Sequence, residues 1–127
     1  MHSETFAAAR HWPANVLAQD CPSRVILQHV TSRWGTLILI ALAEDTLRFA
    51  ELRRKVQGIS ERMLAQTLQV LESDGLVHRH AHDVVPPHVD YRLTPLGLEV
   101  AARVIDLARW IEANLDRLKS EAHQSAE

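Results

Sequence analysis

The chain has 127 residues, 46% of them hydrophobic and 24% charged, with a formal net charge of −2, which predicts one compact domain with its own core. The apolar run at residues 37–43 is far shorter than the roughly 20 residues that cross a bilayer. The first 20 residues lack a signal-peptide pattern, so we expect a cytoplasmic protein without a membrane span.

Cys21 is the only cysteine, which excludes an internal disulfide and a zinc site built from several thiolates. Pro22 favours the first turn of a helix, so Cys21 is predicted at a helix N-terminus, after an N-terminal arm of residues 1–20. Free backbone N–H groups and the helix dipole favour a thiolate there; Arg24 would strengthen this effect and Asp20 would oppose it. The alternative is an inert, small buried residue.

Two short amphipathic helices joined by a tight turn are predicted in residues 48–75, after a central buried helix that begins near Trp34. The first carries apolar residues on one face and leaves basic residues for water or phosphate: Phe49, Leu52 and Val56 against Arg53, Arg54 and Lys55. Gly58 would end this helix, and Ser60 would cap the next one. This order is typical of a DNA-binding helix-turn-helix.

The second helix is predicted to bury a leucine stripe and to turn its polar side chains outward. Arg62 and Gln66 lie one turn apart on the outer face. Arginine can contact guanine, and glutamine adenine, through two hydrogen bonds in the major groove, so these two residues are predicted to contact bases. The other predicted DNA-binding residues are Ser60 and Gln69 near the groove beside Ala65, Arg53, Arg54 and Lys55 at phosphates, and Arg48 and His88. The alternative for each is a solvated surface position.

A β-ribbon is predicted at about residues 76–93. The segment 76–82 lacks helical spacing, and residues 89–93 alternate between apolar and polar. Pro86 and Pro87 cannot donate to a sheet ladder, so they are expected in the loop between the two strands. The predicted fold is therefore a winged helix-turn-helix, mainly α with a small two- or three-stranded antiparallel wing (α+β), whose core covers residues 21–94.

His78, His80 and His82 fall on one face of the first wing strand, with His88 across the ribbon. A metal-responsive regulator that uses these side chains is one alternative function. Histidines that only approach phosphate are the other interpretation. Since no carboxylate or thiolate stands at a familiar metal-ligand spacing beside them, no metal-binding residue is predicted.

One long helix is predicted from Pro95 to about residue 119, with Thr94 as its N-cap and a flexible tail at residues 120–127. Roughly 24 residues would be about 36 Å long, more than a small winged domain covers. We expect a second copy of the chain to cover the apolar stripe, with dimer contacts from Val104, Leu107, Ile111, Leu115 and Leu118. The alternative cover is the chain's own N-terminal segment around Trp12, Val16 and Leu17.

Positive charge is concentrated in the predicted DNA-binding region. Residues 48–66 contain five basic and two acidic side chains, although the sequence pI is about 6.4. A dimer would double this patch and attract a phosphate backbone, with an affinity that falls as salt rises. The acidic overall balance leaves a second class open, a dimeric protein-interaction module of winged-helix shape without DNA binding. An enzyme is not expected, because the four glycines are scattered and no catalytic arrangement can be placed on one face.

Several short motifs resemble the HxlR-type family of winged helix-turn-helix transcriptional regulators, a MarR-related group. They are Cys21-Pro22, Arg33-Trp34, residues 48–52, 58–60, the leucine pattern after Arg62, residues 71–72, 75–77, 85–87 and 91–94, and they span about residues 21–97. The resemblance implies a homodimeric repressor on a pseudo-palindromic DNA operator, without a cofactor. Several members sense oxidants or electrophiles through a cysteine at the place of Cys21. The chain departs from the pattern at His88, where arginine or lysine is usual.

Overall fold

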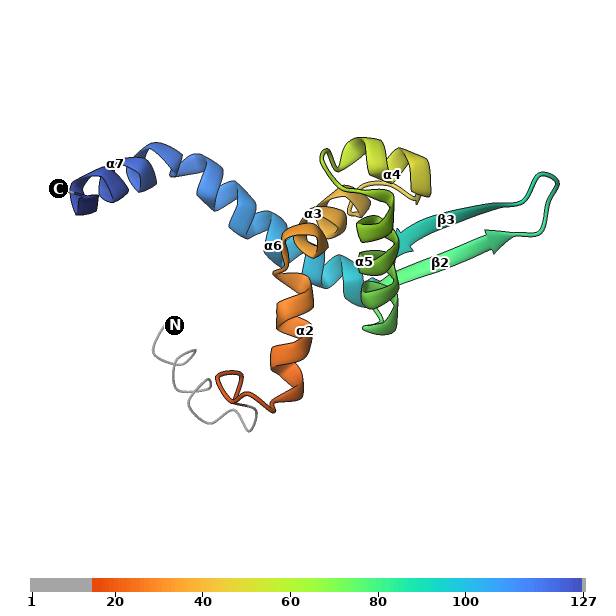
Figure 1. Ribbon diagram of the computed structural model, residues 1–127, viewed down its shortest axis with the longest axis horizontal. Helices are drawn as coiled ribbons and strands as arrows, with labels where there is room; N and C mark the ends of the chain where they lie inside the picture. Colours follow the sequence, from red (N-terminus) through yellow and green to blue (C-terminus); the bar gives the residue numbers. More distant parts are fainter. Residues whose placement is uncertain (1–14, 127) are drawn as a thin grey trace.

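The protein folds as a winged helix-turn-helix, as the sequence predicts. The structure, a computed structural model, describes residues 15–126. The elements in chain order are α2 (Pro22–Val30), α3 (Arg33–Leu42), β1 (Leu47–Arg48), α4 (Phe49–Lys55), α5 (Glu61–Ser73), β2 (Val77–His82), β3 (His88–Leu93), α6 (Pro95–Ala113) and α7 (Leu115–Ala126). The three strands form an antiparallel sheet in the order β1-β3-β2. The long β2–β3 ribbon projects away from the helices as the wing (Figure 1).

Helix α3 is the centre of the core and contacts α2, α4, α5 and α6. Its side chains Ile38 and Leu39 are fully buried, which confirms the predicted central helix. The leucine stripe of α5 and Leu52 of α4 pack into the same core, so the two helices of the helix-turn-helix are fixed by their apolar faces. The polar faces of both helices remain outside.

The turn between α4 and α5 has the predicted chemistry. Gly58 has a φ of +93°, a left-handed conformation that glycine adopts without strain. The Ser60 hydroxyl accepts a hydrogen bond from the Met63 backbone N–H at 3.1 Å and caps α5. Thr94 caps α6 in the same way, accepting from the Gly97 N–H at 3.0 Å. These local signals therefore set where the elements begin.

Gly97 allows α6 to pack closely on the turn that follows α5. A Cβ at this position would lie 2.0 Å from the Leu76 carbonyl oxygen, which is backbone and cannot rotate away. Gly97→Ala is therefore expected to lower the free energy of unfolding by about 1–3 kcal/mol, although alanine ordinarily favours a helix. Urea denaturation measures this loss. The exposed neighbour Glu99 provides the control, since Glu99→Ala should stay within about 0.5 kcal/mol of the unmodified protein. Equal stability of the two variants would contradict this packing.

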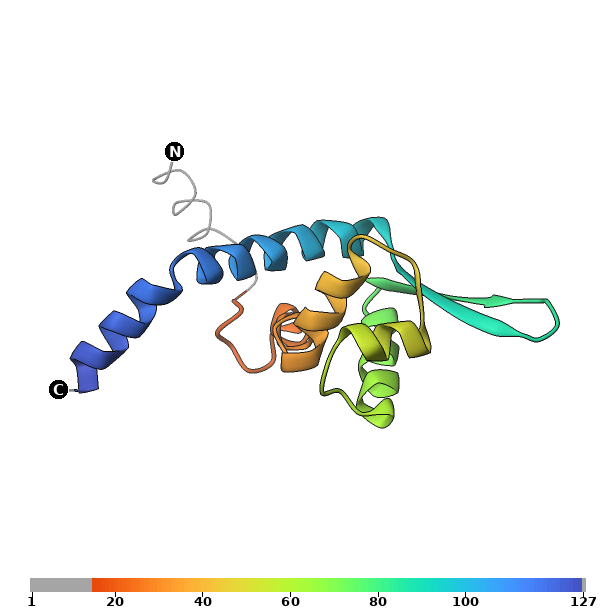
Figure 2. The same ribbon diagram turned by 90° about the horizontal axis from the view of Figure 1, so that it is seen from above.

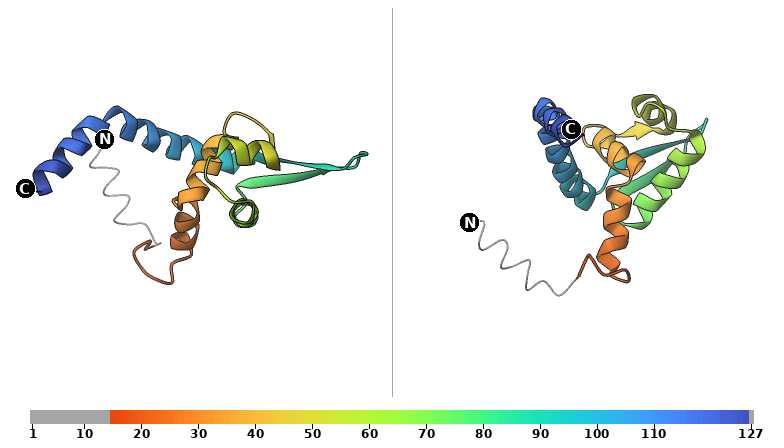
Figure 3. Two further views of the ribbon diagram at one scale, coloured as in Figure 1. Left: turned by 45° about the horizontal axis from the view of Figure 1, so that its top comes forward. Right: turned by 60° about the vertical axis from the view of Figure 1, so that its left-hand side comes forward.

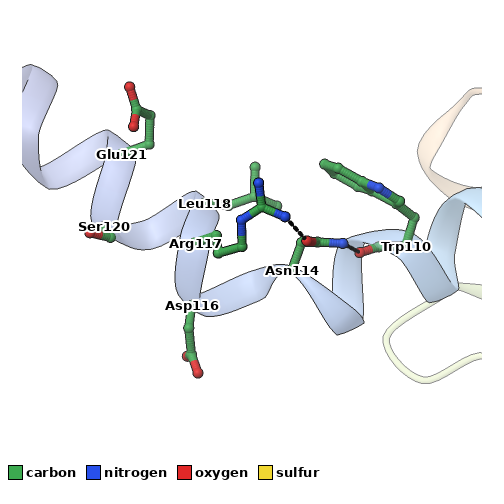
Figure 4. A pocket seen from close by; sticks show the side chains of 7 residues that line it. All are labelled: Trp110, Asn114, Asp116, Arg117, Leu118, Ser120 and Glu121. Atoms are coloured by element: carbon green, nitrogen blue, oxygen red, sulfur yellow. Dashed lines mark hydrogen bonds between the residues drawn. The ribbon is translucent and has the colours of Figure 1, made fainter.

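The C-terminal helix is broken at Asn114, so the predicted single helix over residues 95–119 is wrong. Helix α6 ends at Ala113, and α7 runs in a new direction to Ala126, through most of the predicted flexible tail (Figure 2). The Asn114 side chain donates to the Trp110 carbonyl oxygen at 2.8 Å and accepts from Arg117 at 2.6 Å (Figure 4). Asparagine competes with helical hydrogen bonding in this way and often ends helices.

No single helix among residues 15–126 has both the length and the apolar composition to cross a membrane. Helices α2 and α3 reach these limits only when they are joined across a bend of 69°. Half of the residues of α3 are buried in the core, including Ile38, Leu39 and Leu42. Burial in the domain core therefore accounts for the apolar character of α3.

Candidate nucleic-acid interface

The outer face of α5 is exposed and polar. Helix α5 lies on the outside of the body, against β2 (Figure 3). Arg62, Gln66 and Gln69 are exposed, whereas Leu64 and Leu68 on the opposite face are buried. Within residues 15–126 the three polar side chains make no side-chain hydrogen bond or ion pair. Their donors and acceptors are therefore available to a ligand.

The basic side chains of α4 are exposed, but two of them contact acidic groups. The Arg53 guanidinium lies 3.0 Å from the Glu61 carboxylate at the start of α5. Lys55 Nζ lies 3.9 Å from the Asp45 carboxylate. Exposed ion pairs of this kind contribute little to stability, so a phosphate could compete for either cation. Arg54 forms no ion pair with any residue of the described range.

A hollow of about 310 Å³ separates α5 from the wing, lined by Ala65, Leu68, Gln69, Glu72, Arg79 and Tyr91. Arg79 is exposed on β2 and lies on the ribbon face toward α5. Arg79 is not among the residues predicted to contact DNA. The alternation of side chains along β2, which places Arg79 on the opposite face from His78 and His80, is the sequence feature that could have identified it. The exposed polar face of α5 therefore continues onto the wing through an arginine.

Arg48 and His88 lie on the other face of the ribbon. Arg48 is the register partner of Asp90, and His88 is the partner of His82. Cross-strand partners project on the same face, so both residues share the face of the histidine row. His88 is the first residue of β3. If Arg48 and His88 contact DNA as predicted, the DNA must approach this second face of the wing.

The histidine face also carries a carboxylate that spacing in the sequence could not place. Asp90 on β3 is hydrogen-bonded to His82 on β2. This hydrogen bond is the largest influence on the Asp90 carboxyl and lowers its pKa; burial acts in the opposite direction, and the charges of His82, His88 and Arg48 lower the pKa further. The ring centroids of His82 and His88 lie 4.2 Å apart. Sheet register, which sequence spacing does not give, brings these groups together.

Cys21 lies directly before Pro22, the first residue of α2, as predicted. Its side chain is buried, with 8% exposed. Burial is the largest influence on this thiol and raises its pKa. Hydrogen bonds from Ser23 and the Arg24 backbone, among others, outweigh burial and leave the pKa of Cys21 below its ordinary value. The thiol is therefore shielded, and its pKa is shifted in the direction of the thiolate.

The far half of α6 and the start of α7 carry an uncovered apolar stripe. Leu107, Ile111, Leu115 and Leu118 are between 40% and 55% exposed. Val104, predicted to form dimer contacts with them, is instead buried in the subunit's own core. The first part of α6 lies along the body of the domain, whereas its far end extends beyond it (Figure 2). On the same stretch, a hollow of about 530 Å³ beside Trp110 is lined only by residues of α6, α7 and the bend between them (Figure 4).

Of the N-terminal residues that form the alternative cover, Val16 is half-buried and Leu17 is exposed. Leu17 is 85% exposed, which rules it out as a packed cover. Trp12, the other large side chain of that alternative, lies outside the described residues. Helix α2 adds exposed apolar side chains of its own, Val25, Ile26 and Leu27. The uncovered apolar surface is thus larger than the sequence predicted.

Comparisons with known proteins agree with this architecture. The family model described as HxlR-like helix-turn-helix matches residues 29–119. The HTH-type transcriptional regulator YtfH of Escherichia coli is 62% identical over 101 residues, 80% of each chain. A solved structure of the regulator ytfH from Salmonella typhimurium has a TM-score of 0.81 and 55% identity, covering 87% of this chain and 98% of that one. The redox regulator HypR in its reduced form has a TM-score of 0.71 and 35% identity, covering 78% and 98% of the two chains.

Proposed function

The chain belongs to the HxlR-like helix-turn-helix family of transcriptional regulators, and we propose that it acts as a homodimeric repressor on a pseudo-palindromic operator. In this proposal the protein regulates transcription in the cytoplasm and does not act as an enzyme. The redox state of Cys21 sets its affinity for the operator. The observation that carries the proposal is the outer face of α5, where Arg62 and Gln66 stand exposed and unpaired within the described residues.

The arrangement of α5 supports reading of the major groove. Arg62 is the second residue of α5, close to the capped N-terminus. In helix-turn-helix proteins, the N-terminal part of the recognition helix contacts the base edges. Gln66 follows one turn later, so both side chains can reach the same few base pairs. The exposed Arg54 of α4 and Arg79 of β2 flank this face as phosphate contacts.

The uncovered stripe of α6 and α7 supports the dimer. If a two-fold axis lies beside this stripe, the same residues of a second chain would cover Ile111 and Leu115. Two copies of α5 would then face one DNA duplex, and recognition helices in such dimers enter major grooves about one helical turn, roughly 34 Å, apart. The symmetric operator follows from the symmetry of the protein.

Two observations support a redox response. A structure 35% identical to this chain is described as the redox regulator HypR. In this chain the single cysteine lies at the start of α2, with a pKa below its ordinary value. A thiolate is the form that peroxides and electrophiles attack, so Cys21 has the chemistry that a sensor requires.

Helix α2 offers a physical link between Cys21 and the recognition helix. His29, in the last turn of α2, lies with its Nδ1 2.7 Å from the Asp74 carboxylate, and Asp74 is the C-cap of α5. Oxidation would make the buried Cys21 side chain larger and more polar, which its shielded position disfavours. A shift of α2 in response would pull on α5 through this contact.

Cys21→Ser is expected to abolish the response of DNA binding to oxidants. The reduced variant should bind operator DNA as the unmodified protein does, because serine is close to cysteine in size. After treatment with hydrogen peroxide, the affinity of the unmodified protein should change at least about fivefold, while that of the variant stays constant. Fluorescence anisotropy with a labelled duplex measures both. A variant that still responds to peroxide would rule out Cys21 as the sensor.

Selection of bound duplexes from a random pool tests the main proposal. We expect an enriched, two-fold symmetric sequence whose affinity falls steeply between about 50 and 200 mM salt, because several phosphates are contacted. Repeating the selection with oxidised protein tests the redox arm separately. The competing function is a dimeric protein-interaction module without DNA binding. It predicts no enriched sequence and no salt-dependent shift of any duplex.

A further inference from the structure

The end of the wing gathers three metal-ligating side chains. His82 is the last residue of β2, and His88 is the first residue of β3. The two are register partners, and Asp90 lies two residues further along β3, on the same face. All three side chains are half-buried. The ribbon that carries them projects away from the helices (Figure 1), so packing of the core does not explain their clustering.

The distances within this cluster suit a metal ion. One ligand atom from each of His82, His88 and Asp90 lies within 4.8 Å of the other two. Nitrogen and oxygen ligands lie about 2.0–2.2 Å from zinc, and so about 3.4 Å from one another in a tetrahedron. Small side-chain rotations would therefore bring the three atoms to a common centre. The hydrogen bonds of the β2–β3 ladder already hold the backbone in place.

The donor set selects a class of ion. Two imidazoles and one carboxylate are characteristic of zinc and of other divalent first-row metals such as cobalt and nickel, whereas calcium and magnesium prefer oxygen ligands. His80 provides a further imidazole nearby, with 4.4 Å between its ring centroid and that of His82.

One charge opposes a cation at this place. Arg48 on β1 is the register partner of Asp90 and lies on the same face of the sheet. Its guanidinium reduces the attraction of the single carboxylate for a positive ion. Binding therefore has to come from coordination by the two imidazoles rather than from net negative charge, and this requirement again favours zinc over calcium or magnesium.

We propose that His82, His88 and Asp90 form a binding site for one divalent transition-metal ion of the zinc type on the wing. The ion bridges β2 and β3 and replaces the direct contact between His82 and Asp90. It ties the two strands together next to the loop and adds positive charge to this face. A second consequence rests on the proposed function: the added charge strengthens attraction to the DNA backbone.

Calorimetric titration of the full chain with zinc chloride tests the site without DNA. We expect one ion bound per chain. His88→Gln and Asp90→Asn should each lower the affinity at least about tenfold, because each removes a direct ligand. Cobalt(II) provides a second readout, since its visible absorption reports coordination geometry and should change in both variants. Circular dichroism verifies that the variants are folded, and the two residues lie in the wing outside the buried core.

Two histidine variants serve as matched controls. His78 lies on the same strand and face but outside the cluster, with its ring centroid 6.1 Å from that of His80. His29 forms a second histidine–carboxylate pair, with Asp74, and this pair has no third metal ligand among the described residues. His78→Gln and His29→Gln should both keep the affinity of the unmodified chain.

Absence of saturable binding, or equal affinity in all four variants, would overturn the metal site. Operator affinity measured with and without zinc is a separate arm. If zinc binds at the cluster but no duplex is bound in either condition, the metal site stands and the DNA-binding proposal fails.

Discussion

An Ile111→Asp, Leu115→Asp double variant is expected to be a monomer and to bind operator DNA about 10²- to 10⁴-fold more weakly than the unmodified protein. Ile111 is 41% exposed and Leu115 is 45% exposed, on a stripe that nothing in the described subunit covers. Placing two carboxylates opposite their own copies across a two-fold axis removes apolar burial and adds like-charge repulsion. Without the dimer, the second half-site no longer gains from the high effective concentration of a linked recognition helix.

Sedimentation equilibrium gives the oligomeric state, and anisotropy with full and half operators gives the affinities. Ala113→Asp is the control, because it introduces one such carboxylate at the exposed last residue of α6, outside the apolar stripe. This control should remain dimeric. The double variant should bind a half operator as the unmodified protein does. A double variant that is monomeric and yet keeps full operator affinity would contradict the two-site binding mode.

The elements that follow local rules could be predicted from the sequence. Ser60 and Thr94 are predicted N-caps, and both accept the expected backbone hydrogen bond. Gly58 has the positive φ expected of a glycine in the turn, although α4 already ends at Lys55 rather than at Gly58. The leucine stripe of α5 is buried as its spacing predicts. Each of these features depends on residues within a few positions of one another, which is the range over which a sequence carries direct physical information.

The features that depend on tertiary structure could not be predicted. Asp90 meets His82 only because β2 and β3 pair in one particular register. Val104 belongs to the same apolar stripe as Ile111, but only the point where α6 leaves the body decides that one is buried and the other exposed. Asn114 is a different case, since its competing hydrogen bonds are local and its helix-ending tendency could have been recognised.

Arg62→Ala is expected to lower the affinity for a selected operator by about 2–6 kcal/mol per dimer, at least about 30-fold. A bidentate arginine–guanine contact contributes about 1–3 kcal/mol, and a two-fold dimer makes it twice. Arg62 is exposed at the N-terminal end of α5 and has no partner within the described residues, so no internal contact is lost with it. Binding to random-sequence DNA should fall much less.

Two further variants separate base reading from phosphate attraction. Arg62→Lys keeps the charge but loses the planar, two-pronged donor, so it should bind random DNA normally and still lose most of the preference for the operator. Arg54→Ala, at an exposed position of α4, should weaken binding to both duplexes equally and reduce the salt dependence by about one phosphate contact. If Arg62→Ala shows this second pattern instead, Arg62 contacts the backbone. Base recognition would then pass to Gln66 and the rest of the outer face of α5.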